Sequence, residues 1–235
     1  MYFLLKRAKE IGNIIKDSDE IHIVTHIDAD GISAGAIASE TLQRLNKQFS
    51  IEFVKQLDEQ ISKRLENDNH NLVWFTDLGS SISNNYSKIN KVITDHHVCP
   101  ENSNFSYHLN PHLFNLNGAE QISGAGVTYL VSKSIDKNNL DLSSLAIVGA
   151  IGDLQDRKYC KLVGLNQQIL EDAETKGVVS KKLDICYFGK ETRPVYKLLQ
   201  YSNDPLIPGL TSRESACISF LQELGITMKD GDKWR

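Results

Sequence analysis

The sequence predicts an α/β fold in which a parallel β-sheet is flanked by helices, followed by a mainly helical C-terminal part. Two observations carry this prediction. Short β-branched and aromatic runs alternate with helical patterns along the first half of the chain, which is typical of a parallel sheet with right-handed crossovers. In addition, polar clusters directly follow three of the expected strands. Ligands gather beyond the carboxyl ends of such strands, so the clusters mark the expected functional site.

The first half of the chain supplies the expected sheet. Leu5, Ala8 and Ile15 recur at helical spacing, and the run D-S-D after residue 16 ends this first helix. Small residues dominate the next helical pattern, which suits close packing on a sheet. The expected strands are Ile21–Thr25, Phe49–Val54, Leu72–Thr76 and Lys91–Thr94, and the expected helices are residues 2–16, Ile32–Leu45 and Glu59–Glu66.

The second half is expected to be mainly helical. Residues 98–121 are expected to form a loop, and a strand-like segment is expected near Val178–Cys186. The expected helices are Val127–Ser134, Leu142–Ile151, Leu162–Thr175, Tyr196–Tyr201 and Arg213–Leu224. We expect one catalytic domain over residues 1–235, with a core of residues 18–160 and a helical extension of residues 161–235.

Composition narrows the class of protein. The chain has 235 residues, 40% of them hydrophobic, and a formal net charge of -4. This balance argues against a sequence-reading duplex-DNA binder, which carries a strongly basic face, but it is compatible with a nucleic-acid enzyme whose carboxylates hold cations. The four cysteines are far apart and form no C-x-x-C pair, so we expect reduced thiols and a cytoplasmic location. The first residues fit neither a signal peptide nor a membrane span.

The polar clusters carry ligands typical of metal sites. Two imidazoles and a carboxylate follow one another in Asp95-His96-His97, at the end of an expected strand. The candidate ligands, in chain order, are His26, Asp28, Asp30, Asp77, Asp95, His96, His97 and Asp153. Oxygen-dominated ligation with some imidazole suits manganese or magnesium better than structural zinc. Eight groups exceed the needs of one ion, so we expect two divalent ions and hydrolysis of a phosphate ester or anhydride.

Each candidate also has a structural interpretation. Asp28 and Asp30 have the residue type that caps helices, although capping accounts for one of them and not for the H-x-D-x-D series. Asp77 precedes Gly79 as in an ordinary turn. Asp156 lies close enough to Asp153 to compete for its role.

Three further features have open alternatives. The N–H groups of the segment Ser123–Gly126 are suited to bind a phosphate, or its glycines allow close helix packing. Arg193 is a candidate phosphate contact or a member of an ion pair. His108 and His112 are candidate metal ligands or structural loop residues, and the second interpretation is favoured.

Four ordered motifs resemble those of the DHH phosphoesterase superfamily: H-I-D-A-D-G, D-L-G-S, T-D-H-H and G-A-I-G-D. The segments N-P-H, S-G-A-G-V, F-G-K-E-T-R-P and P-G-L-T-S-R-E are similar to those of archaeal RecJ-like exonucleases, which are relatives of the DHH-type subunit of the eukaryotic replicative helicase. The resemblance extends from about Ile21 to Gly225. It implies a nuclease that acts on single-stranded DNA or RNA in repair or replication.

The resemblance also implies roles for individual residues. His26 and Asp28 would hold the first ion, Asp77 would bridge the two ions, and the second ion would be held by Asp30, His96 and Asp153. His97 would face the substrate phosphate and Asp95 would orient the site, so that these two and Asp77 form the catalytic group. The expected substrate contacts are His97, Ser123, Gly124, Gly126 and Arg193.

The sequence departs from the family pattern in two places. Histidine stands at His26, where bacterial RecJ has an aspartate, although histidine is common there in pyrophosphatases of the superfamily. The glycine-rich G-G-G-H-like signature of the downstream substrate-binding domain does not occur, so we expect that domain to be absent from this chain. Because that domain contributes to binding the nucleic acid, we expect the nuclease activity of this chain alone to be weak or non-processive.

Two other functions compete with the exonuclease prediction. One is hydrolysis of a small substrate, namely short oligoribonucleotides, cyclic dinucleotides or pyrophosphate. The other is a replication scaffold that docks the GINS component of an archaeal helicase. The intact set of ligands argues against a purely structural role.

Overall fold

A computed structural model describes residues 2–81, 88–100, 107–184, 187, 189–190, 192–227, 229–230 and 233–234. The chain divides into two compact units, Met1–Ser180 and Lys181–Arg235. The first unit therefore extends beyond residue 160, where the expected core ended, because the helix α6 (Leu165–Lys176) packs on the helix α5 (Ser143–Gly152). In the part of the chain that is described, no helix is long and apolar enough to cross a membrane.

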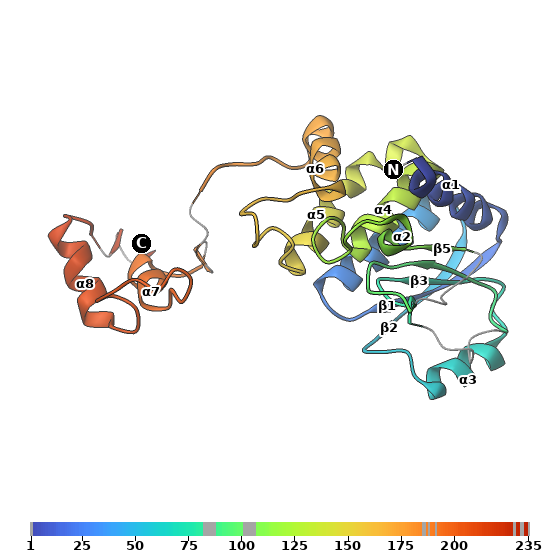
Figure 1. Ribbon diagram of the computed structural model, residues 1–235, viewed down its shortest axis with the longest axis horizontal. Coiled ribbons are helices and arrows are strands. Elements are labelled where there is room, and N and C mark those ends of the chain that lie inside the picture. The colour runs from blue at the N-terminus through green and yellow to red at the C-terminus, as the bar shows by residue number, and fades with distance from the viewer. Residues whose placement is uncertain are drawn as a thin grey trace. The chain divides into compact units, whose positions relative to one another are not determined.

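The first unit contains a five-stranded parallel sheet with the order β2-β1-β3-β4-β5 (Figure 1). Its strands are β1 (Glu20–His26), β2 (Gln48–Val54), β3 (Val73–Thr76), β4 (Lys91–Thr94) and β5 (His108–Leu109). The chain leaves β1 toward β2 on one side and returns to β3 on the other side. In open α/β sheets ligands bind at such a reversal of direction, which here lies at the carboxyl ends of β1 and β3.

Helices cover both faces of the sheet. One face packs against α1 (Tyr2–Asp17), α2 (Ala29–Arg44) and α4 (Gly124–Ile135), and α5 packs on α2 and α4. Buried side chains of these four helices form the main core with the strands. Trp74 is fully buried in that core and donates from Nε1 to Thr94 Oγ1 at 3.0 Å. The other face packs against α3 (Glu59–Asp68), with Leu65 beside Val73 and Phe75 in a second cluster. The predicted parallel sheet flanked by helices is confirmed.

Two details differ from the sequence prediction. The expected loop 98–121 contains the short strand β5, whose pairing with β4 extends the sheet, and the 3-10 helix Pro111–Phe114. Conversely, residues 178–184 of the expected segment Val178–Cys186 form no strand, and residues 185–186 lie outside the described residues. This stretch is exposed, with Leu183 fully solvated, and pairs with no neighbouring strand in the described structure. A β-prone composition forms a strand only where a partner strand completes its hydrogen bonds.

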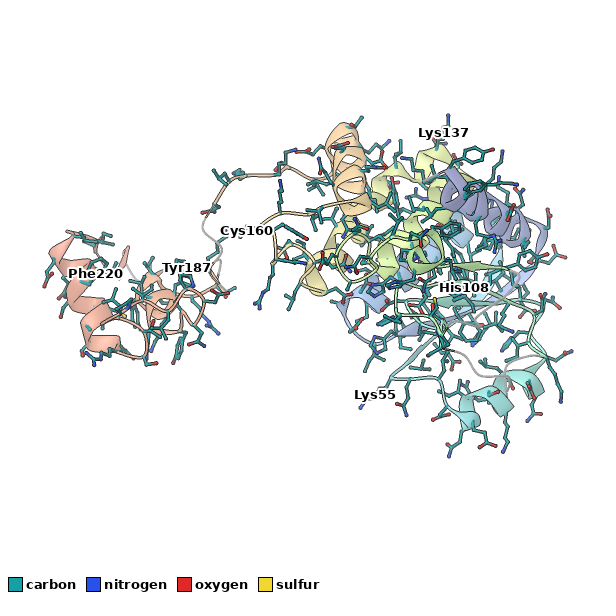
Figure 2. The ribbon with its side chains drawn as sticks, in the orientation of Figure 1. Lys55, His108, Lys137, Cys160, Tyr187 and Phe220 are labelled. Atoms are coloured by element: carbon teal, nitrogen blue, oxygen red, sulfur yellow. The ribbon has the colours of Figure 1, made fainter. Side chains whose placement is uncertain are left out.

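The second unit is small and has its own core. It contains α7 (Val195–Gln200), α8 (Glu214–Glu223) and the two short antiparallel strands β6 (Lys229–Asp230) and β7 (Lys233–Trp234). Tyr196 on α7 packs with Cys217 and Leu221 on α8. The region around α8 is shown with its side chains in Figure 2, where Phe220 is labelled. The expectation of helices in this part of the chain agrees with α7 and α8.

Candidate metal centre

The carboxyl ends of three adjacent strands bring the predicted ligands together. Thr25 of β1 pairs with Thr76 of β3, which in turn pairs with Thr94 of β4. The polar segments that follow these strands therefore begin at the same edge of the sheet. This register explains why motifs far apart in sequence converge on one site.

The first cluster joins His26, Asp28 and Asp77. His26 Nδ1 lies 2.8 Å from Asp28 Oδ2 and 3.8 Å from Asp77 Oδ2. The other oxygen of Asp28 accepts the Gly31 N–H at 2.9 Å and caps α2. Asp28 is therefore both a helix cap and a candidate metal ligand, because one oxygen caps α2 and the other faces His26.

The second cluster joins Asp30, His96 and Asp153. Nε2 of His96 lies 3.3 Å from Asp153 Oδ2, 3.6 Å from Asp30 Oδ2 and 3.3 Å from Asp77 Oδ1. Asp77 and His96 also form a third candidate cluster with His97. Asp77 therefore turns one carboxylate oxygen toward each of the first two clusters, as a shared ligand must.

Several buried atoms of these clusters have no hydrogen-bond partner in the described structure. They are His26 Nδ1, His96 Nε2 and both carboxylate oxygens of Asp77. A buried polar atom left without a partner costs about 1–3 kcal/mol. Divalent cations would satisfy all four atoms at once, and carboxylates with imidazole are ligands that Mn²⁺ accepts. The residues present fit a metal centre.

The ionisation of the clusters supports the same interpretation. Burial, together with the charges of Asp30 and Asp95, raises the pKa of Asp77 to about 9. Burial and the neighbouring Asp30 raise the pKa of Asp153 to about 6. Burial lowers the pKa of His96, but Asp77 and Asp30 outweigh it and raise the pKa to about 10. The clustered negative charge thus attracts a proton, and a divalent cation can replace it.

The backbone sets the orientation of His96. Its Nδ1 contacts the Gly118 carbonyl oxygen at 2.8 Å, so in the neutral ring the lone pair lies on Nε2 and faces the carboxylates. A Cβ on Gly118 would lie 2.0 Å from the carbonyl oxygen of His96, so only glycine permits this approach. The carbonyl of Gly118 also accepts from Gln155 Nε2 at 2.9 Å.

Asp95 is a supporting residue in this geometry. It is buried and accepts hydrogen bonds from the N–H groups of Ser80 and His96 and from Nδ1 of His97, at 2.7–2.8 Å. Burial would raise the pKa of Asp95, but the bond from His97 outweighs it and holds the pKa well below its usual range. The same hydrogen bond raises the pKa of His97, whose side chain is 56% exposed.

The N-terminus of α4 binds Asp30. The N–H groups of Gly124 and Ala125 donate to the Asp30 carboxylate at 2.6 and 3.0 Å, and the Gly126 N–H donates to Ser123 Oγ at 3.2 Å. These donors are used within the protein, so the expected phosphate contact by Ser123, Gly124 and Gly126 is not supported.

Close packing is the interpretation that the geometry of these glycines favours. A Cβ on Gly124 would lie 2.2 Å from Asp77 Oδ1, and one on Gly126 would lie 2.7 Å from a side-chain carbon of Ile122. The helix dipole and the two N–H groups instead stabilise the fully buried carboxylate of Asp30. The helix start thus serves a protein carboxylate.

The remaining candidates lie elsewhere. Arg193 is in the second unit, with its guanidinium over the ring of Tyr201. Asp156, the alternative to Asp153, is in none of the three clusters of described residues. His108 is structural as expected, but it lies in β5 (Figure 2), buried, with Nε2 2.9 Å from Ser80 Oγ. His112 is in the 3-10 helix and in none of the clusters.

Sequence reasoning missed the residues that support the site. Asn110 donates to Ser80 Oγ at 2.6 Å and to the carbonyl oxygen of His97 at 2.8 Å. Gln155 accepts from Asn166 at 2.6 Å and thereby joins α6 to the carbonyl that orients His96. The N-P-H motif was the available signal for Asn110. Ser80 had a comparable signal in the D-L-G-S motif, whereas Gly118 and Gln155 have none, because their role depends on which backbone groups they meet.

Two family profiles match this chain. The DHH family, N-terminal domain, matches residues 20–151, which is more than half of the chain, and the DHH-CID domain matches residues 187–235. The chain belongs to the DHH family. A curated relative, an uncharacterized protein of Methanocaldococcus jannaschii, is 35% identical to this DHH chain over 95% of the chain and 54% of the relative. The chain thus spans about half the length of that relative.

Solved structures share the fold at low identity. RecJ from Thermus thermophilus, in complex with Mn²⁺, is 19% identical with a TM-score of 0.59, over 72% of this DHH chain and 27% of RecJ. An exonuclease RecJ bound to manganese is 21% identical with a TM-score of 0.58, over 73% of this chain and 47% of that protein. CDC45 from Entamoeba histolytica is 16% identical with a TM-score of 0.61, over 93% of this chain and 50% of CDC45. The predicted DHH family is confirmed by the family profile, and the solved structures confirm the fold.

Proposed function

We propose that this chain is the catalytic part of an exonuclease that hydrolyses single-stranded nucleic acid in DNA repair or replication. The observation that supports the proposal is the position of Asp77 between two ligand clusters. One Mn²⁺ or Mg²⁺ ion would be held by His26, Asp28 and Asp77, and a second by Asp77, Asp30, His96 and Asp153. Such a pair, when bound, supplies an activated water at neutral pH and stabilises the negative charge of a transferring phosphoryl group.

The chain's own residues position the reacting groups. Asp30 is fixed by two N–H groups of α4, and His96 is fixed by the Gly118 carbonyl. His97 is proposed to bind the phosphate, because Asp95 raises its pKa and keeps the partly exposed ring charged over a wider pH range. Asp95 accepts hydrogen bonds from the backbone N–H of His96 and from Nδ1 of His97, and it belongs to none of the three clusters of described residues.

A metal-dependent hydrolysis assay tests this proposal. Purified chain is incubated with Mn²⁺ or Mg²⁺ and, in parallel, with single-stranded DNA, single-stranded RNA, a cyclic dinucleotide and pyrophosphate. We expect nucleotide release from a single strand, and a loss in Asp77→Asn that exceeds the roughly 10–100-fold typical of an outer-shell partner. Asp156→Asn is the matched control, because it makes the same change at a carboxylate outside the clusters.

The other outcomes of this assay assign the competing functions. Hydrolysis of the cyclic dinucleotide or pyrophosphate alone would show a small-substrate hydrolase. The absence of metal-dependent hydrolysis of every substrate would contradict the catalytic proposal.

A replication partner is the second proposal. The fold shared with CDC45 extends over 93% of this chain, including the second unit, and this supports a role beside the replicative helicase. We propose GINS of an archaeal replisome as that partner, together with a cytoplasmic location. Co-purification of the chain with GINS tests the docking, and the catalytic and docking roles are compatible with each other.

A further inference from the structure

The two units differ in charge. The second unit, residues 181–235, has nine Lys and Arg against seven Asp and Glu, whereas residues 1–180 have seventeen against twenty-three. The second unit is thus net positive in a chain whose total formal charge is -4. A net positive charge on one part of an otherwise acidic chain favours contact of that part with an anionic partner.

Part of this positive charge gathers around one exposed aromatic ring. Arg193 Cζ lies 5.4 Å from the ring centroid of Tyr201, and Lys197 Nζ lies 5.5 Å from the same centroid. Tyr201 is 54% exposed, whereas its neighbour Tyr196 is buried in the core of the second unit. We call Arg193, Lys197 and Tyr201 the Tyr201 platform.

The second unit holds the platform in place. The backbone N–H of Arg193 donates to the Gly189 carbonyl oxygen at 2.8 Å, and Cδ and Nε of Arg193 would lie 2.9 and 3.0 Å from a Cβ on Gly189. Glycine therefore leaves room for the arginine, and its φ of +81° favours glycine as well. Lys197 Nζ donates to Glu214 at 2.7 Å and Gln200 at 3.0 Å. The side chains are thus positioned before any ligand binds.

A basic and aromatic surface of this kind suits a single strand. Guanidinium and ammonium groups bind phosphates, and unstacked bases stack on a tyrosine ring or on the plane of an arginine. We propose that the Tyr201 platform binds single-stranded nucleic acid, with a base stacked on the pair formed by Tyr201 and Arg193 and with flanking phosphates bound by Arg193 and Lys197. The inference rests on the proposed function, because the strand bound here is the proposed substrate of the metal centre.

Binding is measured by fluorescence anisotropy on the full chain, with labelled oligothymidylate and excess EDTA so that no hydrolysis occurs. We expect Tyr201→Leu to weaken binding by about 5- to 100-fold, as for the loss of one stacked base. Tyr201→Phe keeps the aromatic ring and should bind as tightly as the wild type. Arg193→Gln should weaken binding and reduce the slope of log affinity against log salt by about 0.7. Circular dichroism checks that each variant remains folded.

Tyr159→Leu is the matched control. Tyr159 is exposed and also lies below a cation, with Lys158 Nζ 5.2 Å from its ring centroid, but its hydroxyl donates to Glu120 at 3.1 Å. At Tyr159 one carboxylate, Glu120, contacts both the ring hydroxyl and the lysine, whereas at the Tyr201 platform Glu214 contacts Lys197 and the ring has a second cation, Arg193. We expect Tyr159→Leu to bind oligothymidylate as the wild type does.

An abasic strand of the same length separates stacking from charge. The proposal expects the wild type to bind it more weakly than oligothymidylate, by a factor close to that of Tyr201→Leu. Equal affinity for both strands would overturn the proposal, and a loss confined to Arg193→Gln would then show that this surface contacts phosphates without stacking on bases. Because binding is measured without metal, an intact platform on a chain that hydrolyses nothing would contradict only the proposed function.

Discussion

At the scale of single residues, Asp77 is the residue on which the candidate metal site depends most. It adopts a left-handed backbone conformation with φ of 57°, which is uncommon for a residue other than glycine. Its carboxylate is buried, both oxygens lack hydrogen-bond partners in the described structure, and burial raises its pKa to about 9. Each feature costs stability in the metal-free protein. Such a cost is typical of a residue kept for its function.

Replacing the Asp77 carboxylate should raise the stability of the metal-free protein and weaken its binding of Mn²⁺. The raised pKa of Asp77 means that stability is lost as the pH rises from the unfolded value near 4 toward 9. We expect Asp77→Asn to stabilise the metal-free protein by about 1–2 kcal/mol near pH 7 and to abolish most of the stabilisation by Mn²⁺. Thermal unfolding in EDTA and in Mn²⁺ measures both effects. Equal stabilisation of the variant and the wild type by Mn²⁺ would contradict a shared ligand.

A histidine pair far along the strands from the metal centre gives a second prediction. His22 stacks on His70 with 4.1 Å between ring centroids, and its Nε2 lies 3.3 Å from Glu52 Oε1. Burial lowers the pKa of His22, and the charge of His70 adds to this, against the opposing effect of Glu52. The unfolded chain therefore takes up a proton below about pH 6.5 that folded His22 resists.

Acid should consequently destabilise the first unit through His22. We expect the free energy of unfolding to fall between about pH 7.5 and about pH 5.5, and to fall less in His22→Gln. Urea unfolding followed by Trp74 fluorescence, in a Trp234→Phe background, measures the difference. His70→Gln removes the stacked ring and should also reduce the pH dependence. An identical pH dependence in the wild type and both variants would show that the pair is not responsible.

At the scale of elements, the first turn of α4 contributes both to the stability of the helix and to the geometry of the candidate metal site. Ser123 caps the helix, and a Cβ on Gly124 would lie 2.2 Å from Asp77 Oδ1. The two positions are adjacent, yet one supports the helix and the other makes room for the carboxylate. Substitutions at these positions should therefore have separable effects.

Alanine at each position tests this separation. We expect Ser123→Ala to lower stability by about 1 kcal/mol and to leave Mn²⁺ affinity nearly unchanged. Gly124→Ala should displace Asp77 and weaken Mn²⁺ binding by about tenfold or more. Isothermal titration with Mn²⁺ gives the affinities, and thermal unfolding in EDTA gives the stabilities. Unchanged Mn²⁺ affinity in Gly124→Ala would show that Asp77 does not depend on this close approach.

At the scale of the whole molecule, the two units have unequal cores. The first unit buries an extensive cluster around Trp74, whereas the second buries a small cluster around Tyr196, Cys217 and Leu221. Small domains bury a smaller fraction of their surface and are correspondingly less stable. All three candidate ligand clusters lie within the first unit.

The units should therefore unfold separately. We expect Cys217, which is fully buried, to become reactive toward a thiol reagent at a lower urea concentration than that at which Trp74 fluorescence changes. Mn²⁺ should shift the Trp74 transition and leave the Cys217 transition in place. Mass spectrometry locates the labelled cysteine. Coincident transitions, both shifted by Mn²⁺, would show that the two units unfold as one.

Much of the fold and the choice of site residues could be predicted from sequence alone. Strand and helix patterns with polar clusters at strand ends are local signals, so the parallel sheet and the converging residues His26, Asp28, Asp77 and His96 were within reach. The segment near Val178 was predicted incorrectly because a strand depends on a neighbour that composition does not reveal. The short strand β5 was missed because two residues carry too little pattern.

Tertiary structure decided the roles that depend on distance and on competition for hydrogen bonds. It gave the N–H groups of α4 to Asp30 instead of a phosphate, and it separated Asp153 from Asp156. It also showed that the two oxygens of Asp77 face different clusters. Residue type specifies which chemistry a side chain can perform. Only the packing of strand ends against helix starts specifies which atoms lie within bonding distance, and therefore which of those chemistries is available.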